Sequence, residues 1–409
     1  MTGQPGAVRD AIAEMTRPRR GIDDVEVSGR RVLVRVDFNV PIEAGRIVDD
    51  RRIRAALPTI TRLRERGARI VLATHLGRPG GAVVEKLRVA PLAERLGELL
   101  GITVPVSGDV AGEGAIALVN GLHDGDVGML ENVRFEAGEE TDDPELADRL
   151  ASLADVYVDD AFGAAHRAHA STHGVATRLP AVAGLLMQSE LTHLGAVLAE
   201  PARPLVAIVG GSKVSGKLAV LQTLLDRVDV LWVGGAMACT FYRAMGAGTG
   251  TSLVEEDRVE DARALLERAR ANGVSLRVPP DAVVATGPRA DAAVGTVAWN
   301  AIPDNLAAVD VGPATVAAIT VDVVTAATVV WNGPLGIYEV PAFAAGTTAV
   351  AHALADSTAT TVVGGGDCAA AVEAAGVADH ITFISTGGGA TLELLEGRSL
   401  PGVAVLQPA

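Results

Sequence analysis

Lysine and cysteine are both scarce in this chain of 409 residues. Only three of its 35 basic residues are lysines: Lys86, and the pair Lys213 and Lys217, which share one glycine-containing segment. Because lysine is so rare elsewhere, we expect this pair to have a function. The two cysteines, Cys239 and Cys368, are too few for a disulfide framework and are typical of a reducing cytosol.

Long apolar runs are also absent. No stretch reaches the roughly 18 uncharged residues that a membrane-spanning helix requires. Residues 1–21 are polar and lack the apolar core of a secretory signal. The net charge of −15 argues against a general binder of nucleic acid or of anionic membranes. We therefore expect a cytoplasmic protein in which any anion site is a local basic cluster, since residues 1–185 and 186–409 are both net acidic.

Short apolar runs alternate with longer segments of helical period, which is typical of α/β proteins with parallel sheets. The length suits two domains. The expected strands are Arg31–Val36, Arg69–Thr74, Val127–Leu130 and Val156–Val158, then Leu205–Val209, Val230–Val233, Thr328–Trp331, Thr360–Val363 and Ile381–Ile384. The expected helices include Ile53–Arg66, Pro91–Leu100, Glu145–Ala154 and Arg258–Asn272, with Gly184–Glu200 joining the halves.

The residues that follow the expected strands differ between the two halves. In the first half they are acids, amides, arginines and a histidine: Asp37, Asn39, His75, Arg78, Glu131, Asn132, Arg134, Asp159, Asp160 and Arg167. In the second half they are glycine-rich turns at 210–213, 234–237, 331–336, 364–368 and 385–390. Ligands of open α/β sheets bind at the carboxyl ends of strands. The pattern therefore indicates an anionic metabolite on the first half and a nucleotide on the second.

The segment GSKVSGKL (211–218) nearly matches a phosphate-binding P-loop between a strand and a helix. The residue after Lys217 should be a serine or threonine that holds magnesium, but it is Leu218, which cannot coordinate a metal. Backbone N–H groups at such a helix start can still bind phosphate. The glycine turns at 364–367 and 385–390 also let the backbone approach phosphate closely. In the first of these, Asp367 suits a magnesium ion carried by nucleotide phosphates; a simple helix N-cap is the less favoured interpretation.

Three histidines, His166, His169 and His173, have a spacing that could place their imidazoles on one helical face. A zinc site is one interpretation of this spacing. No cysteine or clear fourth ligand accompanies them, so we do not favour it.

Taken together, the motifs resemble those of phosphoglycerate kinase, in order from about residue 30 to residue 402. In the first half they are RVDFNVP (35–41), DDRRIRAALPTI (49–60), THLGRP (74–79), LENVRF (130–135) and DDAFGAAHRAHAST (159–172). In the second half they are GGSKVSGK (210–217), WNGPLGIYE (331–339), GGGD (364–367) and STGGGATLELLEG (385–397).

The resemblance implies two Rossmann-like lobes with parallel sheets flanked by helices, joined by an interdomain helix and a hinge. The implied boundaries are 1–183 for the phosphoglycerate lobe, 184–200 for the helix and 201–399 for the nucleotide lobe. The tail 400–409 is expected to return to the first lobe, whereas residues 1–20 precede the matching segments and have no assigned role.

The resemblance also implies the site residues. Those expected to bind phosphoglycerate are Asp37, Asn39, Arg52, His75, Arg78, Arg134 and Arg167. Those expected to bind the nucleotide are Lys217, Gly234, Gly235, Gly312, Asn332, Glu339, Gly365, Gly366, Asp367 and Cys368. Among these, Glu339 would bond the ribose and Asp367 would take Mg²⁺. Lys213, Arg52 and Gly388 would stabilise the phosphoryl group during its transfer.

The implied reaction is reversible in-line phosphoryl transfer from 1,3-bisphosphoglycerate to MgADP, giving 3-phosphoglycerate and MgATP in glycolysis and gluconeogenesis. Such a transfer needs positioning and charge stabilisation but no covalent enzyme intermediate. We expect a monomer without nucleic-acid or membrane partners. The alternatives are a catalytically quiet homologue that only binds nucleotide and, with less support, a P-loop NTPase.

Two positions depart from the family pattern. Cys368 stands where many members have threonine, so we expect a weaker phosphate donor and an unusually acidic, oxidisable thiol at a helix start. Ala236 stands where a third glycine is usual and adds a methyl group near the adenine pocket.

Overall fold

The computed structural model describes residues 12–199, 201–287, 289 and 294–409. The chain divides into two compact units: unit 1 is Met1–Gly195 with Ser399–Ala409, and unit 2 is Ala196–Arg398. The division therefore falls inside the expected interdomain segment 184–200. Residues 1–11 of the N-terminal segment and Glu200 of that helix lie outside the described residues.

The sheet of unit 1 has five parallel strands in the order β5-β4-β1-β6-β7. Val34 of the central strand pairs with Leu72 on one side and with Val158 on the other, and all three are buried. Burial on both faces explains why these strands are continuous apolar runs. The strands are β1 (Arg31–Val36), β4 (Arg69–Ala73), β5 (Val127–Met129), β6 (Val156–Asp160) and β7 (Ala181–Ala183), with a hairpin of β2 (Ile42–Glu43) and β3 (Arg46–Ile47).

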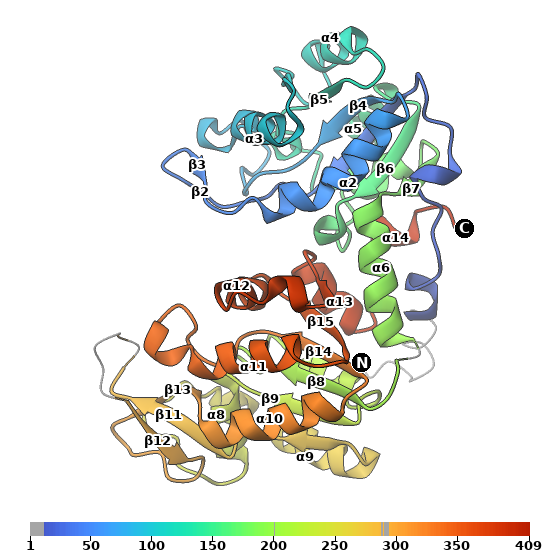
Figure 1. Cartoon of the computed structure of the whole chain (residues 1–409). Coiled ribbons are helices and arrows are strands. Elements are labelled where there is room, and N and C mark those ends of the chain that lie inside the picture. Colours follow the sequence, from blue (N-terminus) through green and yellow to red (C-terminus); the bar gives the residue numbers. More distant parts are fainter. Residues whose placement is uncertain (1–11, 200, 288, 290–293) are drawn as a thin grey trace. The chain divides into compact units, whose positions relative to one another are not determined.

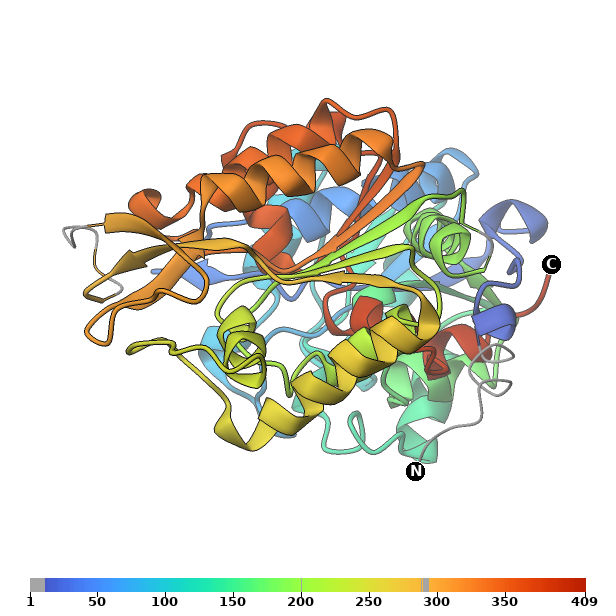
Figure 2. The ribbon, with the colours of Figure 1, turned by 90° about the horizontal axis from the view of Figure 1, so that it is seen from below.

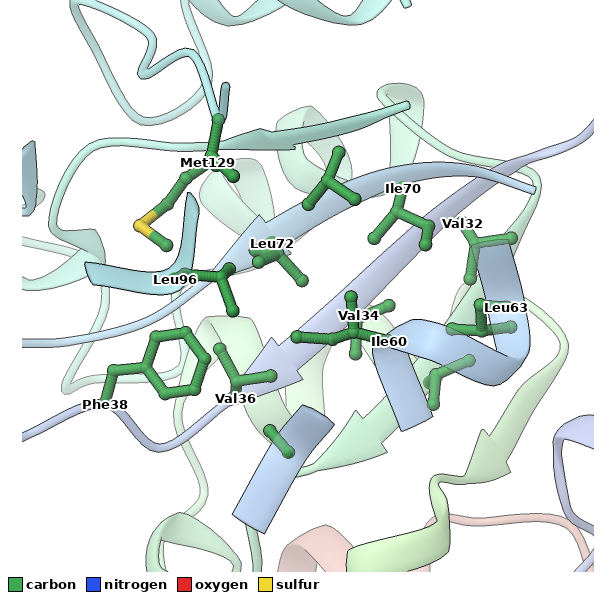
Figure 3. Packing of buried hydrophobic residues seen from close by; sticks show 14 of the residues in the cluster. Val32, Val34, Val36, Phe38, Ile60, Leu63, Ile70, Leu72, Leu96 and Met129 are labelled. Carbon is green, nitrogen blue, oxygen red and sulfur yellow. The ribbon is translucent and has the colours of Figure 1, made fainter. Parts of the chain in front are cut away.

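Two amphipathic helices, α2 (Arg51–Glu65) and α3 (Ala90–Leu100), pack on one face of this sheet (Figure 1). Ile60 and Leu63 of α2 and Leu96 of α3 join the strand residues in one buried cluster (Figure 3). Helical spacing of the apolar residues puts them on a single face, and their burial drives the packing. The other helices of unit 1 are α4 (Glu113–Gly121), α5 (Pro144–Ser152), α6 (Leu185–Leu198) and α14 (Pro401–Ala404), with short helical turns at Ile22–Asp24, Glu85–Leu87, Val133–Phe135, Phe162–Ala164 and Ala170–Gly174.

The helix expected to join the halves is α6, and two side chains satisfy its first N–H groups. Asp160 Oδ1 accepts a hydrogen bond from the N–H of Leu186 at 2.9 Å, and Thr59 Oγ1 accepts one from Leu185 at 2.9 Å. Gly184 precedes the helix because a Cβ there would lie 2.1 Å from Asp160 Oδ1. Complete burial raises the pKa of Asp160 to about 7.

The two ends of unit 1 pair with each other. The N–H of Arg20 donates to the carbonyl of Gln407 at 2.9 Å, and the N–H of Gln407 donates to the carbonyl of Ala181 at 3.1 Å. Met15 and Leu400 are buried beside this pairing. The described residues before 21 therefore have a packing role that the sequence did not indicate.

The main sheet of unit 2 has six parallel strands in the order β10-β9-β8-β14-β15-β16. Figure 2 shows α10 and α11 on one side of this sheet and α9 on the other. The strands are β8 (Leu205–Val209), β9 (Val230–Val233), β10 (Ser275–Arg277), β14 (Thr328–Asn332), β15 (Thr360–Gly364) and β16 (Phe383–Ile384). The helices are α7 (Leu218–Leu224), α8 (Met237–Ala244), α9 (Val259–Asn272), α10 (Pro313–Thr325), α11 (Ala345–Ala355), α12 (Gly366–Ala374) and α13 (Gly389–Leu395), with short turns at Glu256–Arg258, Pro341–Phe343 and Ala378–His380.

Unit 2 also contains a three-stranded antiparallel sheet that the sequence analysis did not predict. Its order is β12-β11-β13, formed by β11 (Asp281–Ala285), β12 (Val294–Ala298) and β13 (Ala307–Val311). The expectation of parallel sheets alone was therefore incomplete. All nine expected strands are present, with ends that differ by at most two residues. Among the described helices, none combines the length and the apolar character that crossing a membrane requires.

Replacing Asp160 with asparagine keeps an oxygen for the N–H of Leu186 and removes the buried charge. The pKa of Asp160 is about 7 in the folded protein against 3.8 for an ordinary aspartate. Between pH 3.8 and about 7, Asp160 is therefore protonated in the folded protein but ionised in the unfolded chain. The stability of the folded protein falls as the pH rises through this window. In urea denaturation, we expect the free energy of unfolding of D160N to exceed that of the wild type by about 1–3 kcal/mol at pH 8. Near pH 4 we expect the two values to be equal.

The exposed Asp304 provides a matched control, because D304N should show no difference at either pH. A D160N variant that is destabilised equally at both pH values would contradict the charged, desolvated state of this carboxylate.

Candidate active site

Each parallel sheet changes the direction of strand addition once, and ligands of open α/β sheets bind at such switch points. In unit 1, the chain adds β4 and β5 on one side of β1 and then β6 and β7 on the other. In unit 2, it adds β9 and β10 on one side of β8 and then β14, β15 and β16 on the other. Ligands are therefore expected at the turns after β1 and β6 in unit 1 and after β8 and β14 in unit 2.

In unit 1, Arg52 in the first turn of α2 meets the residues that follow β1. Its Nη1 lies 3.0 Å from Asp37 Oδ2 and donates to the carbonyl of Asn39 at 3.2 Å. Asn39 Oδ1 in turn accepts the N–H of Gly77, in the loop after β4, at 2.9 Å. Three of the predicted phosphoglycerate ligands thus form one connected cluster.

The loop that carries His75 is held from the end of β5. Arg134 Nη1 donates to the carbonyl of Gly77 at 2.7 Å. The buried amide of Asn132 accepts the N–H of Leu76 at 3.2 Å and donates to the carbonyl of the same residue at 2.8 Å. The LENVRF segment therefore positions the THLGRP segment.

His75 is buried within a group of arginines, with 5% of its surface exposed. Burial lowers the pKa of His75 well below the usual value, and the neighbouring positive charges lower it further; they belong to Arg35, Arg134, Arg167 and Arg52. The nearest of these is Arg35, whose Nη2 lies 3.1 Å from His75 Nδ1. A neutral imidazole surrounded by guanidinium groups is an environment that favours a bound anion.

Arg78 and Arg167 complete the predicted set in unit 1. Arg78 is exposed and makes no hydrogen bond or ion pair to any residue that the structure describes. Arg167 is half-buried, and its Nε donates to His166 Nε2 at 3.0 Å. Both arginines therefore keep donor groups for a ligand.

The three histidines of the 166–173 segment do not converge. His169 Nδ1 lies 3.7 Å from Glu139 Oε1, whereas His173 Nδ1 lies 2.7 Å from Asp142 Oδ2. In the described part of the chain, no group of three or more histidine, cysteine, aspartate or glutamate side chains is arranged to hold a metal ion. The geometry does not support zinc.

In unit 2, glycines bring the turns after β8, β9 and β14 into backbone contact. A Cβ at Gly210 would lie 2.1 Å from the carbonyl oxygen of Pro334. Gly235 has a φ of +68°, and a Cβ there would lie 2.4 Å from the carbonyl oxygen of Gly211. A Cβ at Gly234 would lie 2.2 Å from Leu335 Cδ2. Two predicted nucleotide ligands, Gly234 and Gly235, are therefore needed for packing in any case.

Lys217 and Asn332 meet at the switch point of unit 2. Lys217 precedes α7, and its Nζ hydrogen-bonds to Oδ1 of Asn332 at the end of β14. Burial lowers the pKa of Lys217 to about 8. The Nδ2 of Asn332 is buried and has no hydrogen-bond partner among the described residues. A partly desolvated cation with few partners is suited to bind phosphate.

The turn after β15 places Asp367 in the first turn of α12, where its carboxylate is exposed. Gly365, which precedes the helix, has a φ of +94°. The expectation of an unusually acidic, oxidisable thiol at Cys368 is wrong. Its side chain is fully buried in the core, and burial raises the pKa of the thiol. Desolvation of the buried side chain outweighs the effect of the helix N-terminus and of the neighbouring Lys217.

The remaining predicted residues also occupy turns of unit 2. Gly312 precedes α10, where Asp281 accepts the first helical N–H groups, and a Cβ at Gly312 would lie 2.2 Å from Asp281 Oδ2. Glu339 is exposed after β14, and Lys213 is exposed between β8 and α7. Gly388 directly precedes α13 and has a φ of +53°.

Comparison with known proteins decides between the interpretations of these two sites. A family model described as phosphoglycerate kinase matches residues 22–398. The chain belongs to the phosphoglycerate kinase family. It is therefore an enzyme of the phosphotransferase class whose acceptor is a carboxyl group, and the P-loop NTPase interpretation is not supported.

Individual phosphoglycerate kinases are similar to this chain over almost its whole length. The phosphoglycerate kinase of Acaryochloris marina is 54% identical over 393 residues, which cover 95% of this chain and 98% of the relative. That of Moorella thermoacetica is 55% identical over 385 residues, covering 94% and 98%. The solved phosphoglycerate kinase of Coxiella burnetii aligns with a TM-score of 0.86 and 42% identity, covering 95% and 98%. That of Pyrococcus horikoshii aligns with a TM-score of 0.81 and 32% identity, covering 94% and 98%.

Sequence reasoning missed buried residues that lie beside the predicted phosphoglycerate-binding residues. Arg35 lies inside a matched motif, but no sequence signal shows that its side chain reaches His75. Glu139 lies outside the matched motifs, although it is fully buried beside Ser171. Asn132 follows an expected strand and lies inside the matched segment LENVRF, and these were the available signals for its role in the His75 loop.

We expect Gly235→Ala to destabilise the kinase without nucleotide present. The left-handed backbone and the contact with Gly211 together should cost about 2 kcal/mol or more. Gly248→Ala is the matched control, because a Cβ there meets no atom within 4 Å. Thermal unfolding of both variants tests this, and equal melting temperatures would contradict the packing role.

We expect Lys217→Met to stabilise the ligand-free enzyme by about 1–3 kcal/mol at pH 7. The pKa of Lys217 is about 8 in the folded protein and 10.5 for an ordinary lysine, so the unfolded chain binds the proton more tightly. The wild type therefore gains stability as the pH rises from about 8 to about 10.5, and the advantage of the variant should fade in this window. Urea denaturation at pH 7 and pH 10 measures the difference in the free energy of unfolding between the variant and the wild type at each pH. A variant that is less stable than the wild type at pH 7 would show that desolvation of the Lys217 ammonium does not destabilise the folded protein.

Proposed function

We propose that unit 1 binds 3-phosphoglycerate or 1,3-bisphosphoglycerate and that unit 2 binds ADP or ATP. The observation that carries this division is the chemistry of the two switch points. Unit 1 presents guanidinium groups around a neutral histidine, and planar guanidinium forks suit the carboxylate and phosphate of a small anion. Unit 2 presents a desolvated lysine and glycine turns at helix starts, which suit the phosphates of a nucleotide.

In unit 1 we assign the substrate to the seven predicted residues. Arg52 is held by Asp37 and by the carbonyl of Asn39, which orients its guanidinium without using all of its donors. Arg78 is exposed and unpaired within the described residues, so its guanidinium is available for phosphate. The assigned residues are Asp37, Asn39, Arg52, His75, Arg78, Arg134 and Arg167.

In unit 2 we assign the nucleotide to Lys217, Asn332, Glu339 and the turn Gly365–Cys368, with Gly234, Gly235 and Gly312 contributing backbone. Cys368 acts through its backbone N–H, since its side chain is buried in the core. Replacement of threonine by cysteine should therefore affect phosphate binding little. The exposed carboxylate of Glu339 is available to the ribose hydroxyls.

We infer that Mg²⁺ accompanies the nucleotide and that Asp367 holds it. The carboxylate of Asp367 is exposed and makes no hydrogen bond or ion pair within the described residues. Oxygen ligands are those that Mg²⁺ prefers, and it is commonly held by one or two carboxylates together with substrate phosphates. When bound, the ion neutralises charge on the phosphate oxygens.

The transfer itself requires in-line alignment and charge stabilisation of the phosphoryl oxygens. We assign Lys213, Arg52 and the helix start at Gly388 to this task. Lys213 is exposed on the loop between β8 and α7 and has no hydrogen bond to the described residues, so its ammonium is free to meet the phosphoryl group. We further infer that closure through a hinge aligns the substrates and excludes water.

A catalytically quiet homologue was the alternative that the sequence left open, and the likeness to phosphoglycerate kinases over nearly the whole chain favours the active enzyme instead. A quiet homologue would bind ATP through the same turns and show no turnover. The presence of Lys213, Asp367 and all four predicted arginines favours the active enzyme, since binding alone does not need them together. We also propose a cytoplasmic monomer without nucleic-acid or membrane partners, which sedimentation of the purified chain can test for oligomeric state.

A coupled assay tests the active enzyme. ATP, magnesium and 3-phosphoglycerate are supplied, and an NADH-dependent dehydrogenase reduces the bisphosphoglycerate product. We expect NADH loss that needs all three components and falls about 100-fold in Lys213→Ala and in Asp367→Asn. Lys86→Ala is the matched control, because it removes the third and exposed lysine and should keep turnover within about twofold.

Turnover above about a tenth of the wild-type rate in Lys213→Ala would disprove the role of this lysine. Folded wild-type protein that binds ATP without turnover would favour the quiet homologue, whereas ATP hydrolysis without 3-phosphoglycerate would favour an NTPase.

A further inference from the structure

A buried polar network in unit 1 contacts His75 from the side of the core, and none of the assignments above uses it. Its centre is Arg35, which is 1% exposed. Arg35 Nε donates to Ser171 Oγ at 2.9 Å, and its Nη1 donates to the carbonyl of Val36. Ser171 Oγ donates to Glu139 Oε1 at 2.6 Å, and the N–H of Ser171 donates to Glu139 Oε2 at 2.9 Å. A fully buried carboxylate thus balances a fully buried guanidinium through one serine.

The third donor of Arg35 points at His75, where Nη2 lies 3.1 Å from Nδ1. A guanidinium in a protein is always protonated and has no acceptor. The contact is therefore a hydrogen bond only if Nδ1 of His75 carries no proton. The single proton of the neutral ring must then lie on Nε2.

The surroundings keep the ring neutral. The charged groups that face His75 are Arg35 from β1, Asp37 after β1, Arg52 from α2, Arg134 after β5 and Arg167 after β6. Four of these five are cationic, and together with burial they disfavour a second proton on the imidazole. Asp37 is the exception, but its Oδ1 lies 4.0 Å from Nδ1 and its Oδ2 is paired with Arg52.

We propose that Arg35 is a positioning residue that holds His75 as the neutral Nε2–H tautomer, so that Nε2 offers one hydrogen bond to an anionic oxygen of the phosphoglycerate. No group in the described part of the chain hydrogen-bonds to Nε2. The inference rests on the proposed function for the assignment of His75 to this substrate. The tautomer itself does not depend on that assignment.

The network explains how the Nε2–H of His75 can be held in place as a donor while the imidazole stays neutral. An imidazolium would also donate, but it would need a nearby carboxylate, and the fully buried carboxylate of this network, Glu139, is engaged with Ser171. Tyr157 strengthens the arrangement, because its hydroxyl donates to the carbonyl of Ser171 at 3.1 Å. A preset donor costs no reorganisation when the anion binds.

Nitrogen-15 NMR of histidine-labelled, ligand-free, full-length enzyme tests the tautomer directly. The ring signals of His75 are those that disappear in His75→Gln. Between pH 6 and pH 8 we expect a protonated Nε2 and an unprotonated Nδ1, and addition of 3-phosphoglycerate should shift Nε2 without moving the proton. An Nδ1–H tautomer, an equal mixture or an imidazolium in the free enzyme would overturn the proposal.

Two variants test the role of the network. In Arg35→Met we expect a mixture of tautomers and a KM for 3-phosphoglycerate that rises about tenfold, with the KM for ATP unchanged. In Ser171→Ala, which removes the link between Arg35 and Glu139, we expect the same signature with a smaller rise. Arg31→Met is the matched control, because Arg31 lies at the other end of β1 and pairs with Asp155 at 2.6 Å.

The results separate the possible failures. A KM that rises while the wild-type tautomer persists would make Arg35 merely structural and overturn the proposal. If Arg35→Met does not fold, the wild-type spectrum and Ser171→Ala still decide the question. A wild type without turnover would disprove the proposed function, yet the spectrum of the free enzyme would remain a valid test of the tautomer.

Discussion

Desolvation of positive charge is the constraint on which both candidate sites depend. A site for anionic metabolites needs cations, and excluding water from them strengthens their interaction with a ligand but destabilises the protein without one. Two of these cations differ in how far neighbouring groups compensate for the lost water. Arg35 is balanced by Glu139 through Ser171, whereas the ammonium of Lys217 hydrogen-bonds, within the described residues, to the amide oxygen of Asn332 alone. This contrast is the physical basis for the proposals that Arg35 positions another side chain and that Lys217 binds phosphate.

The parallel sheets decide where these cations gather. Every strand of a parallel sheet ends at the same edge, so turns that are far apart in sequence become neighbours there. In unit 1, this brings Asp37, Gly77 and Arg134 into one hydrogen-bonded group. In unit 2, glycines allow the turns after β8, β9 and β14 to touch through their backbones. A net acidic chain can in this way present two local sites for anions.

The strands and the strand-end motifs were predictable because their signals are local. Apolar runs such as Leu205–Val209 match the structure at both ends, and the turns that follow them contain the residues that the family motifs mark. The antiparallel sheet of β11, β12 and β13 was not predicted; its strands are as long as Leu205–Val209, but they pack on a small separate cluster around Tyr242 and Trp299 and not on the main core. Cys368 was misjudged because position at a helix start says nothing about which way a side chain points.

Periodicity and short motifs in the sequence were enough to predict the α/β class, the family and the candidate site residues. How those residues are paired, and in which direction burial shifts their pKa values, follows only from the packing of each unit. Arg35 reaches His75 across 40 positions of sequence, and Ser171 reaches Arg35 across 136. Burial raises the pKa of Cys368 and lowers that of Lys217, although both lie at helix starts. Such effects depend on the distance to partners and to water, which follows from the packing of the whole unit.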